Sequence, residues 1–243
     1  MKIVDCPWEI ENLACRVAEV SLNANDVAAD VLSKLEQQYD YIVVKVPIAA
    51  ITLNKMLSDK GFMFIENQIT FQKRIEQLEV DSKLVQQYLK RSAVKRVESE
   101  GELQMLINNL TPNMFSTDRI YLDSAFGPKY SLRRYRNWII SEYKRGTVVM
   151  LHYFRDSLVG FSMCRPVGEV LHGLLSGVFE KYQNAGIGMF LPLIPHYYRD
   201  YGVTTYTGKF SSNNFPVIRM HEQLRYNYID MEYVFVKHIK HKY

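Results

Sequence analysis

Short hydrophobic segments with strand-like and helix-like spacing alternate along almost the whole of this 243-residue chain. Residues 41–46 are rich in β-branched side chains, as in a strand, whereas 26–38 carries apolar residues at helical spacing. No run of about 18 uncharged apolar residues occurs, so we expect no membrane span. This alternation predicts an α/β fold, because each strand and each helix must bury its apolar side against a neighbour.

The first half of the chain predicts a small α/β unit. Its expected helices are 26–38 and 51–60, and its expected strands are 41–46 and 62–71. Residues 76–99 are highly charged, which suits a connecting segment that leads into a new strand near 93–97. We therefore predict a smaller N-terminal domain with its linker over residues 1–90 and a second domain over 91–243.

The second half predicts the same alternation at greater length. Its expected elements are helices at 100–110 and 131–144, a hairpin of strands 147–155 and 158–165, a strand at 170–179, a helix at 187–201, a strand at 204–210, a helix at 214–224 and a strand at 228–238. The helix at 187–201 is expected despite Pro192 and Pro195.

Composition excludes several classes of function. The formal charge of +4 and the pI near 8.8 are too mild to indicate a nucleic-acid partner, although they suit an anionic ligand. Cys6, Cys15 and Cys164 have no pair spacing typical of zinc sites or disulfide frameworks, so we expect no metal. The N-terminus shows no apolar core of a signal peptide. We therefore expect a cytoplasmic protein without membrane partners.

One segment carries a recognisable chemical signal. Residues 173–179 form a strand pattern, which is followed by the loop Gln183–Gly188 and then by an apolar helix pattern. Free backbone N–H groups at a helix start attract anions, and glycines let the backbone approach a phosphate closely. The loop is not a Walker motif, because no Lys-Ser/Thr follows its second glycine. It is a candidate cradle for a pyrophosphate.

The spacing Gln183-x-x-Gly186-x-Gly188 after a Leu-Leu-x-x-Val strand resembles the coenzyme-A loop of the GNAT acetyltransferase superfamily. The stretch from Asp118 onward is similar to one subgroup, the dTDP-fucosamine acetyltransferases, which acetylate an amino group on a nucleotide-linked sugar. The resemblance implies a mixed, splayed central sheet within about 95–243, flanked by helices. A smaller truncated α/β domain would precede this sheet and pack at its side.

The resemblance also implies how acetyl-CoA would bind. Ser176, Gly177 and Val178 would offer backbone groups to the pantetheine arm, and the amide near Val178 would stabilise the oxyanion. The residues implied to hold the pyrophosphate are Gln183, Asn184, Ala185, Gly186, Ile187 and Gly188. Asn214 opens the helix that follows and is expected near the pantetheine.

The helix signature of the family departs here at two places. The family pattern is Asn-x-x-Ala-x-x-Leu-Tyr-x-x-x-Gly-Phe, and this chain keeps Asn214 but has His221 in place of Tyr and Arg225 in place of Gly. The family's Tyr protonates the departing thiolate, and a histidine can also donate a proton. We therefore predict that His221 is the general acid. The alternative is that the position has lost its function.

A general base is also expected, because an ammonium must lose a proton before it attacks. His172 falls early on the strand that leads to the coenzyme loop, where one branch of the superfamily carries its base. His152 is a weaker candidate. The alternative for each is a histidine without a catalytic role.

The basic run Arg133, Arg134 and Arg136 is interleaved with Tyr135 and Trp138. One interpretation is a clamp for a substrate phosphate beside an aromatic face, for which we select Arg134 and Trp138. The other is an ordinary helix with a core side and a solvated side.

We therefore expect an N-acetyltransferase that takes acetyl from acetyl-CoA and passes it to a small-molecule primary amine, first of all an amino sugar on a nucleotide. The alternatives are an enzyme for an amino acid, a protein N-terminus or another small amine, and a catalytically degenerate module that only binds coenzyme A. A homodimer is a candidate arrangement.

Overall fold

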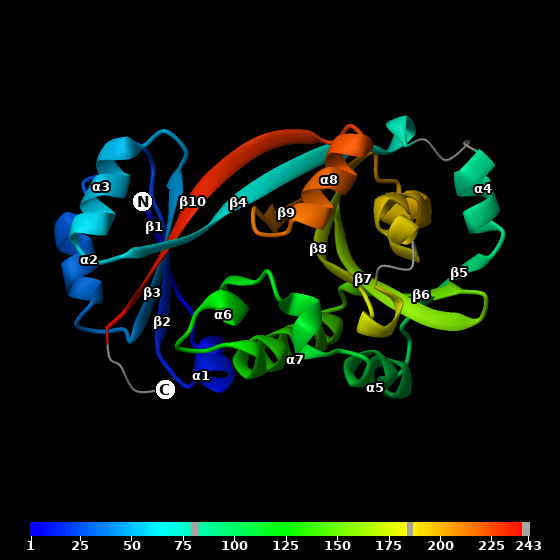
Figure 1. Cartoon of the computed structure of the whole chain (residues 1–243), viewed down its shortest axis with the longest axis horizontal. Helices are drawn as coiled ribbons and strands as arrows, with labels where there is room; N and C mark the ends of the chain where they lie inside the picture. The colour runs from blue at the N-terminus through cyan, green and yellow to red at the C-terminus, as the bar shows by residue number, and fades with distance from the viewer. Residues whose placement is uncertain (79–82, 184–186, 240–243) are drawn as a thin grey trace.

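The computed structural model describes residues 1–78, 83–183 and 187–239. Its strands form one mixed, mostly antiparallel ten-stranded sheet in the order β1-β2-β3-β10-β4-β9-β8-β7-β6-β5. Helices flank this sheet, which runs through the whole molecule (Figure 1). The fold is therefore α/β, as the alternating sequence pattern predicts.

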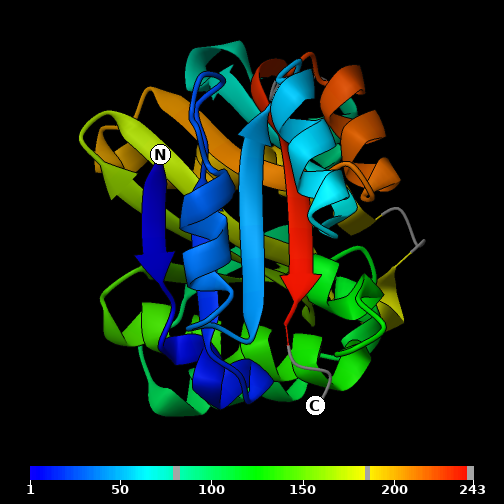
Figure 2. The same ribbon diagram turned by 90° about the vertical axis from the view of Figure 1, so that its left-hand side faces the viewer.

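The N-terminal end of the sheet holds three short strands and the helices between them. These elements are β1 (Lys2–Asp5), α1 (Trp8–Leu13), β2 (Val17–Ser21), α2 (Ala29–Leu35), β3 (Tyr41–Pro47) and α3 (Ile51–Asp59). Figure 2 looks onto this end, with α2 and α3 in front of the strands. Alternate residues of β3 serve two cores, since Val44 packs toward Leu32 and Leu57 while Val43 packs toward α1 and α6.

Two long strands join this end of the sheet to the rest. They are β4 (Met63–Arg74) and β10 (Asn227–His238), and each has twelve residues. β10 pairs with β3 on one side and β4 on the other, and β4 pairs in turn with β9 (Thr205–Ser211). In Figure 1 they cross the molecule as long curved arrows.

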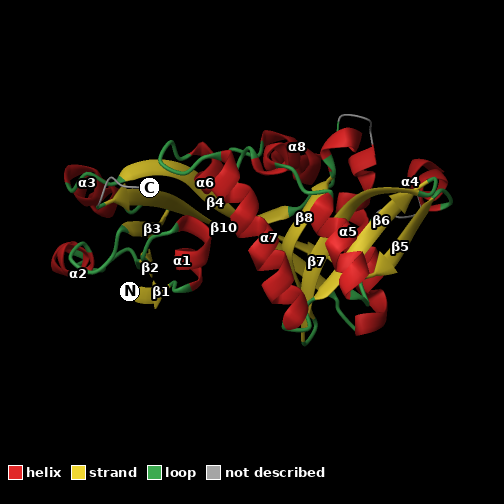
Figure 3. Cartoon of the chain, turned by 90° about the horizontal axis from the view of Figure 1, so that it is seen from below, coloured by secondary structure: helices red, strands yellow, loops and turns green. Residues whose placement is uncertain are grey.

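The C-terminal half supplies the remaining elements. They are η1 (Ile75–Gln77), α4 (Lys83–Leu89), β5 (Ser92–Arg96), α5 (Glu100–Asn108), η2 (Pro112–Phe115), α6 (Arg119–Leu122), α7 (Pro128–Lys144), β6 (Val148–Phe154), β7 (Ser157–Val167), β8 (Val170–Val178), η3 (Glu180–Tyr182), η4 (Ile187–Tyr201) and α8 (Phe215–Gln223). Seen from below in Figure 3, α5 and α7 lie over β6 and β7.

Alternation along β6 explains why helices cover both faces here. Val149 and Leu151 pack with α5 and with Ile139 of α7, whereas Val148 and Met150 pack with apolar residues of η4 on the other face. A strand buried on both sides is largely apolar, and β6 is apolar and buried from Val148 to Leu151; the buried His152 that follows is hydrogen-bonded to Ser162.

The structure differs from the sequence-based expectation in two respects. The smaller unit does not pack beside a sheet built from 95–243; it continues that sheet, because β4 lies between β9 and β10. The division near residue 90 stays a prediction. The segment 187–201 is a 3₁₀ helix and not an α-helix, and both Pro192 and Pro195 lie inside it.

None of the described helices combines the length and the apolar character that a membrane span requires.

Candidate functional site

Strands β8 and β9 are parallel neighbours that separate after a short paired stretch. Pairing covers only Val170–Gly173 of β8 and Thr205–Gly208 of β9. Beyond that point β8 continues to Val178 and β9 to Ser211 without pairing to each other. The strand edges inside this V-shaped opening can therefore bind an extended ligand through backbone groups.

The closed end of the V requires two glycines. A Cβ on Gly208 would lie 3.0 Å from the carbonyl oxygen of Gly173 and 2.8 Å from the ring of Phe71. A Cβ on Gly173 would lie 2.6 Å from the hydroxyl of Tyr206. All three distances are below normal contact, so the two strands can meet here only without side chains at these positions.

A β-bulge coincides with this point. Cys164 of β7 pairs with Gly173 and Met163 pairs with Leu175, so that Leu174 has no partner on β7. A bulge bends its strand and increases its twist. The bend in β8 therefore falls where β8 leaves β9, which helps to hold the V open.

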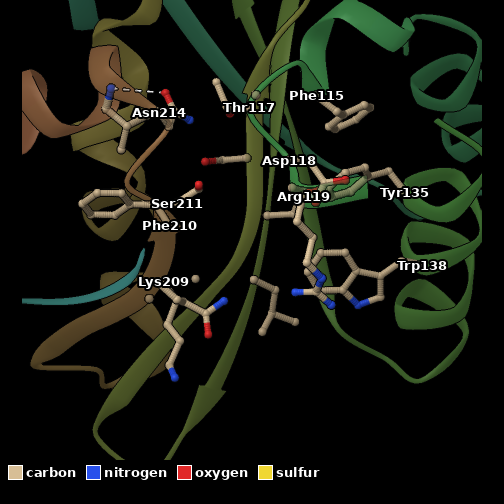
Figure 4. A pocket seen from close by; sticks show the side chains of 18 of the residues that line it. Phe115, Thr117, Asp118, Arg119, Tyr135, Trp138, Lys209, Phe210, Ser211 and Asn214 are labelled. Atoms are coloured by element: carbon tan, nitrogen blue, oxygen red, sulfur yellow. Dashed lines mark hydrogen bonds between the residues drawn. The ribbon is translucent and has the colours of Figure 1, made fainter. Parts of the chain in front are cut away.

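The V opens into one cavity of about 1010 Å³ that both halves of the chain line. In Figure 4, Lys209, Phe210, Ser211 and Asn214 of the β9–α8 side face residues of η2, α6 and α7 across it. Figure 1 places α8 on one side of the sheet and α6 and α7 on the other. The cavity therefore passes through the sheet at the splayed strands.

Among the described residues, three of the ten predicted coenzyme residues line this opening. Ser176, Gly177 and Asn214 line the cavity. The side-chain amide of Gln183 donates to the carbonyl oxygen of Val178 at 3.2 Å, which ties the start of the loop to the end of β8. Ile187 and Gly188 begin η4. Asn184, Ala185 and Gly186 lie outside the described residues.

Asn214 caps α8, as its place in the sequence suggests. Its side-chain oxygen accepts a hydrogen bond from the backbone N–H of Val217 at 3.4 Å. Val217, Met220 and His221 of the same helix also line the cavity. The helix thus presents one side, from its first turn to its last, to the opening between the strands.

The C-terminal end of α8 shows how the chain accommodates Arg225 at the position of the family's glycine. Arg225 has a φ of 53°, in the left-handed region that favours glycine. Its N–H donates to Glu222 O at 3.1 Å, and the N–H of Tyr226 donates to His221 O at 2.9 Å, which is a Schellman ending. The Lys73 ammonium donates to the carbonyl oxygens of Leu224 and Arg225, at 3.0 and 3.3 Å. The backbone therefore keeps the glycine geometry without the glycine.

His221 lies in an aromatic cluster at the edge of the cavity. Its ring centroid is 4.4 Å from those of Phe71 and Tyr226 and 4.9 Å from that of Phe210, and 5% of the residue is exposed. Burial lowers the pKa of His221 to about 4. The neutral imidazole is therefore the main species at neutral pH. Within the described chain its Nδ1 has no hydrogen-bond partner.

The other two histidines that the sequence analysis names lie in different surroundings. His172 is half-buried on β8, pairs with Thr207 across the closed end of the V and lines the cavity. His152 does not line it. His152 shares a 2.8 Å hydrogen bond with Ser162 and stacks on Phe190, and burial lowers its pKa to about 3. His152 therefore has the environment of a core residue.

The basic run on α7 does not converge on the cavity. Arg133 donates to the carbonyl oxygen of Asn12 at 2.7 Å, and Arg136 donates to that of Leu110 at 3.1 Å. Arg134 does line the cavity, but it forms a 2.7 Å ion pair with Glu9. Trp138 also lines the cavity, and its contact with a substrate stays a prediction.

A set of buried or half-buried charges from both halves lines the cavity, and sequence reasoning missed it. We call it the inner charge cluster; its members are Glu9, Glu19, Lys45, Glu66, Asp118, Arg119 and Arg134. They come from α1, β2, β3, β4, α6 with its cap, and α7. No local motif marks such a cluster, because only the folded sheet brings these positions together.

Most members of the inner charge cluster are paired with one another. Glu19 lies 2.6 Å from the Lys45 ammonium and 3.7 Å from the Arg119 guanidinium. Asp118 accepts hydrogen bonds from the Ile120 N–H and from the Ser131 and Tyr135 hydroxyls. Glu66 differs: among the described residues it forms no ion pair, and burial raises its pKa, against the opposing effect of Arg119.

Over the same described ranges, no group of three or more His, Cys, Asp or Glu side chains is placed to hold a metal ion.

The sequence matches no protein-family profile and no curated protein. Solved structures do resemble the fold. A conserved protein of unknown function from Staphylococcus epidermidis aligns with a TM-score of 0.66 at 15% identity, over 96% of this chain and 88% of that one. A GCN5-related N-acetyltransferase from Kribbella flavida aligns with a TM-score of 0.62 at 12% identity, over 97% of this chain and 86% of that one. Another such acetyltransferase, from Sphaerobacter thermophilus, aligns with a TM-score of 0.64 at 11% identity, over 98% of this chain and 76% of that one. These likenesses show the fold.

Proposed function

We propose that this protein, which has the fold of the GCN5-related N-acetyltransferases, transfers an acyl group from coenzyme A to a primary amine. The observation that carries the proposal is the separation of β8 and β9 at Gly173 and Gly208, directly above a cavity that the coenzyme-loop strand also lines. The pantetheine arm would lie between the two strands, with acetyl as the simplest acyl group. The location we propose is the cytoplasm.

In this mechanism the chain binds and orients the reactants and moves protons. The neutral amine attacks the thioester carbon, the carbon–sulfur bond breaks, and the thiolate takes up a proton. Near Val178, where β8 no longer pairs with β9, backbone N–H groups of β8 would stabilise the oxyanion. His221 would protonate the thiolate from its imidazolium form, which its lowered pKa makes a minor species at neutral pH. His172 would take the proton of the ammonium, and both histidines line the cavity.

An amino sugar on a nucleotide is one candidate acceptor. A cavity of about 1010 Å³ lined by Trp138 is large enough to favour it, because cavities of this size hold drug-sized ligands. Arg134 would contact the substrate only if Glu9 released it. Amino acids and other small amines are the second group, and a non-catalytic coenzyme-A-binding module is the third proposal.

The test is release of free thiol from acetyl-CoA in the presence of a panel of amines, with identification of the acetylated product by mass spectrometry. We expect amine-dependent thiol release and an N-acetyl product. If coenzyme A binds but no amine in the panel, nucleotide amino sugars included, stimulates thiol release, the transferase proposal gives way to that of a binding module.

A further inference from the structure

Two carboxylates of the inner charge cluster, Glu66 and Asp118, form no ion pair among the described residues, and Glu66 is the more buried of the two. Asp118 accepts three hydrogen bonds in place of an ion pair. Glu9 is paired with Arg134, and Glu19 with Lys45. Only 5% of Glu66 is exposed, yet it lines the cavity. Its one described polar partner is the Ser211 hydroxyl. A buried carboxylate in this state is costly unless a cation joins it.

The net charge of the inner charge cluster also favours a cationic ligand. The cluster has four carboxylates, Glu9, Glu19, Glu66 and Asp118, and three cations, Lys45, Arg119 and Arg134, so it carries one net negative charge. Two exposed cations also line the cavity, but Lys209 is paired with Glu232 and Arg145 with Glu142. Glu66 lies on the same side of β4 as Gln68 and Thr70, which line the cavity beside it. This end of the cavity therefore favours a cationic group over a phosphate.

Glu66 also lies far from the place where the thioester is expected. His221 packs against Phe71, and Glu66 is five positions away from Phe71 along β4, about 16 Å at the usual rise per residue. An amine that attacks a thioester beside His221 could not also touch Glu66. A group that binds Glu66 must be a second, distant part of the same acceptor.

Resting on the proposed function, we propose that Glu66 binds a second cationic group of the acceptor, so that the substrate is an elongated amine with positively charged nitrogens at both ends. One amine would attack the thioester at the V of β8 and β9. The other would remain an ammonium and pair with Glu66, which makes Glu66 a binding residue and not the base.

The experiment compares diamines of increasing length, from ethylenediamine through putrescine and cadaverine to longer homologues, with matched monoamines as acceptors. For the wild-type protein we expect kcat/KM to rise with diamine length to an optimum well beyond ethylenediamine. Glu66→Gln should raise KM for the best diamine by about tenfold to a hundredfold, the size expected for losing a buried charge partner. Its kcat at saturation and its activity on monoamines should change little.

The matched control is Glu11→Gln, which neutralises an exposed carboxylate at the rim of the same cavity and should leave the length dependence intact. Equal KM values for wild type and Glu66→Gln, or no preference of the wild type for diamines, would overturn the inference. Acetyl transfer to monoamines would still support the proposed function in that case. Should no amine be acetylated, calorimetry with the best-binding diamine decides: binding lost in Glu66→Gln supports the inference, and equal binding contradicts it.

Discussion

The two ends of the cavity are built in different ways. The end at which we propose that coenzyme A binds consists of strand edges and two glycines in close contact, with the start of η4 next to the end of β8, all within 173–211. The acceptor end consists of charged side chains from six segments between Glu9 and Arg134. Backbone geometry recognises a ligand by its shape, whereas a charge cluster recognises it by charge. We therefore expect that substitutions can alter the two ends independently, so that proteins of this fold can share a coenzyme site while their acceptors differ.

His221 lies where the two ends meet, and replacing it should have the largest effect. His221→Phe keeps the aromatic packing against Phe71 and Tyr226 but has no proton to donate, whereas His221→Tyr restores a donor. If His221 is the acid, the Phe variant should lose about 10²- to 10⁴-fold in kcat while the Tyr variant retains activity. The measurement is steady-state kinetics with acetyl-CoA and the best amine; equal kcat in the Phe variant and the wild type would remove His221 from the mechanism.

The two ends of the cavity differ in how well the sequence predicts them, because one is built from adjacent residues and the other from distant ones. The helix start at Ile187 and the cap at Asn214 were predictable because the residues that mark them are adjacent in the chain and their spacing is recognisable. The role of the loop Gln183–Gly188 stays a prediction. Glu66 gave no such signal, because a glutamate within an alternating strand usually faces solvent. In the folded chain Glu66 interacts with Arg119 and Ser211, which are distant in sequence.

The position of β10 within the sheet could not be predicted from its own residues either. Its own residues predict a strand at 228–238, and the structure has one at 227–238. Nothing within it indicates that Val234 and Val236 pair with Lys45 and Val43 of β3, nearly two hundred residues earlier. The departure at Arg225 was visible in the sequence, but only the left-handed φ shows that the backbone geometry survived it.

The buried state of His221 should also appear as acid sensitivity of the fold. Its pKa in the folded protein is about 4, below the usual value of 6.5. The unfolded chain therefore takes up a proton between pH 6.5 and 4 that the folded chain does not, and stability falls as the pH falls through this window. His221→Phe should lessen this loss by on the order of 2–3 kcal/mol.

Urea unfolding at pH 7 and at pH 4 measures that loss for both proteins. His152, which also has a lowered pKa, remains in both and cancels in the comparison. The same loss between the two pH values in both proteins would mean that water reaches His221 and that the aromatic cluster is looser than described.

Arg225→Gly should have the smallest effect, on stability and not on chemistry. Glycine adopts a φ of 53° without the cost that other residues incur, so we expect stabilisation by about 1 kcal/mol, or roughly 2–4 °C in Tm. Arg219→Gly is the matched control, because Arg219 is an exposed position inside the same helix. It should destabilise the protein by about 1 kcal/mol. Thermal unfolding that shows the same sign for both substitutions would contradict the described helix ending.

The central claim is that coenzyme A binds at the opening between β8 and β9, with its pyrophosphate at the start of η4. Gly188 tests it most directly, because a Cβ there would meet, among the described residues, Val178 alone at an ordinary 3.7 Å, which leaves room for a side chain. Isothermal calorimetry should show that Gly188→Glu weakens coenzyme-A binding by about a hundredfold or more, since a carboxylate would face the pyrophosphate. Gly188→Ala should bind with a far smaller loss. Wild-type affinity in Gly188→Glu, with an unchanged melting temperature, would place the coenzyme elsewhere and contradict the account.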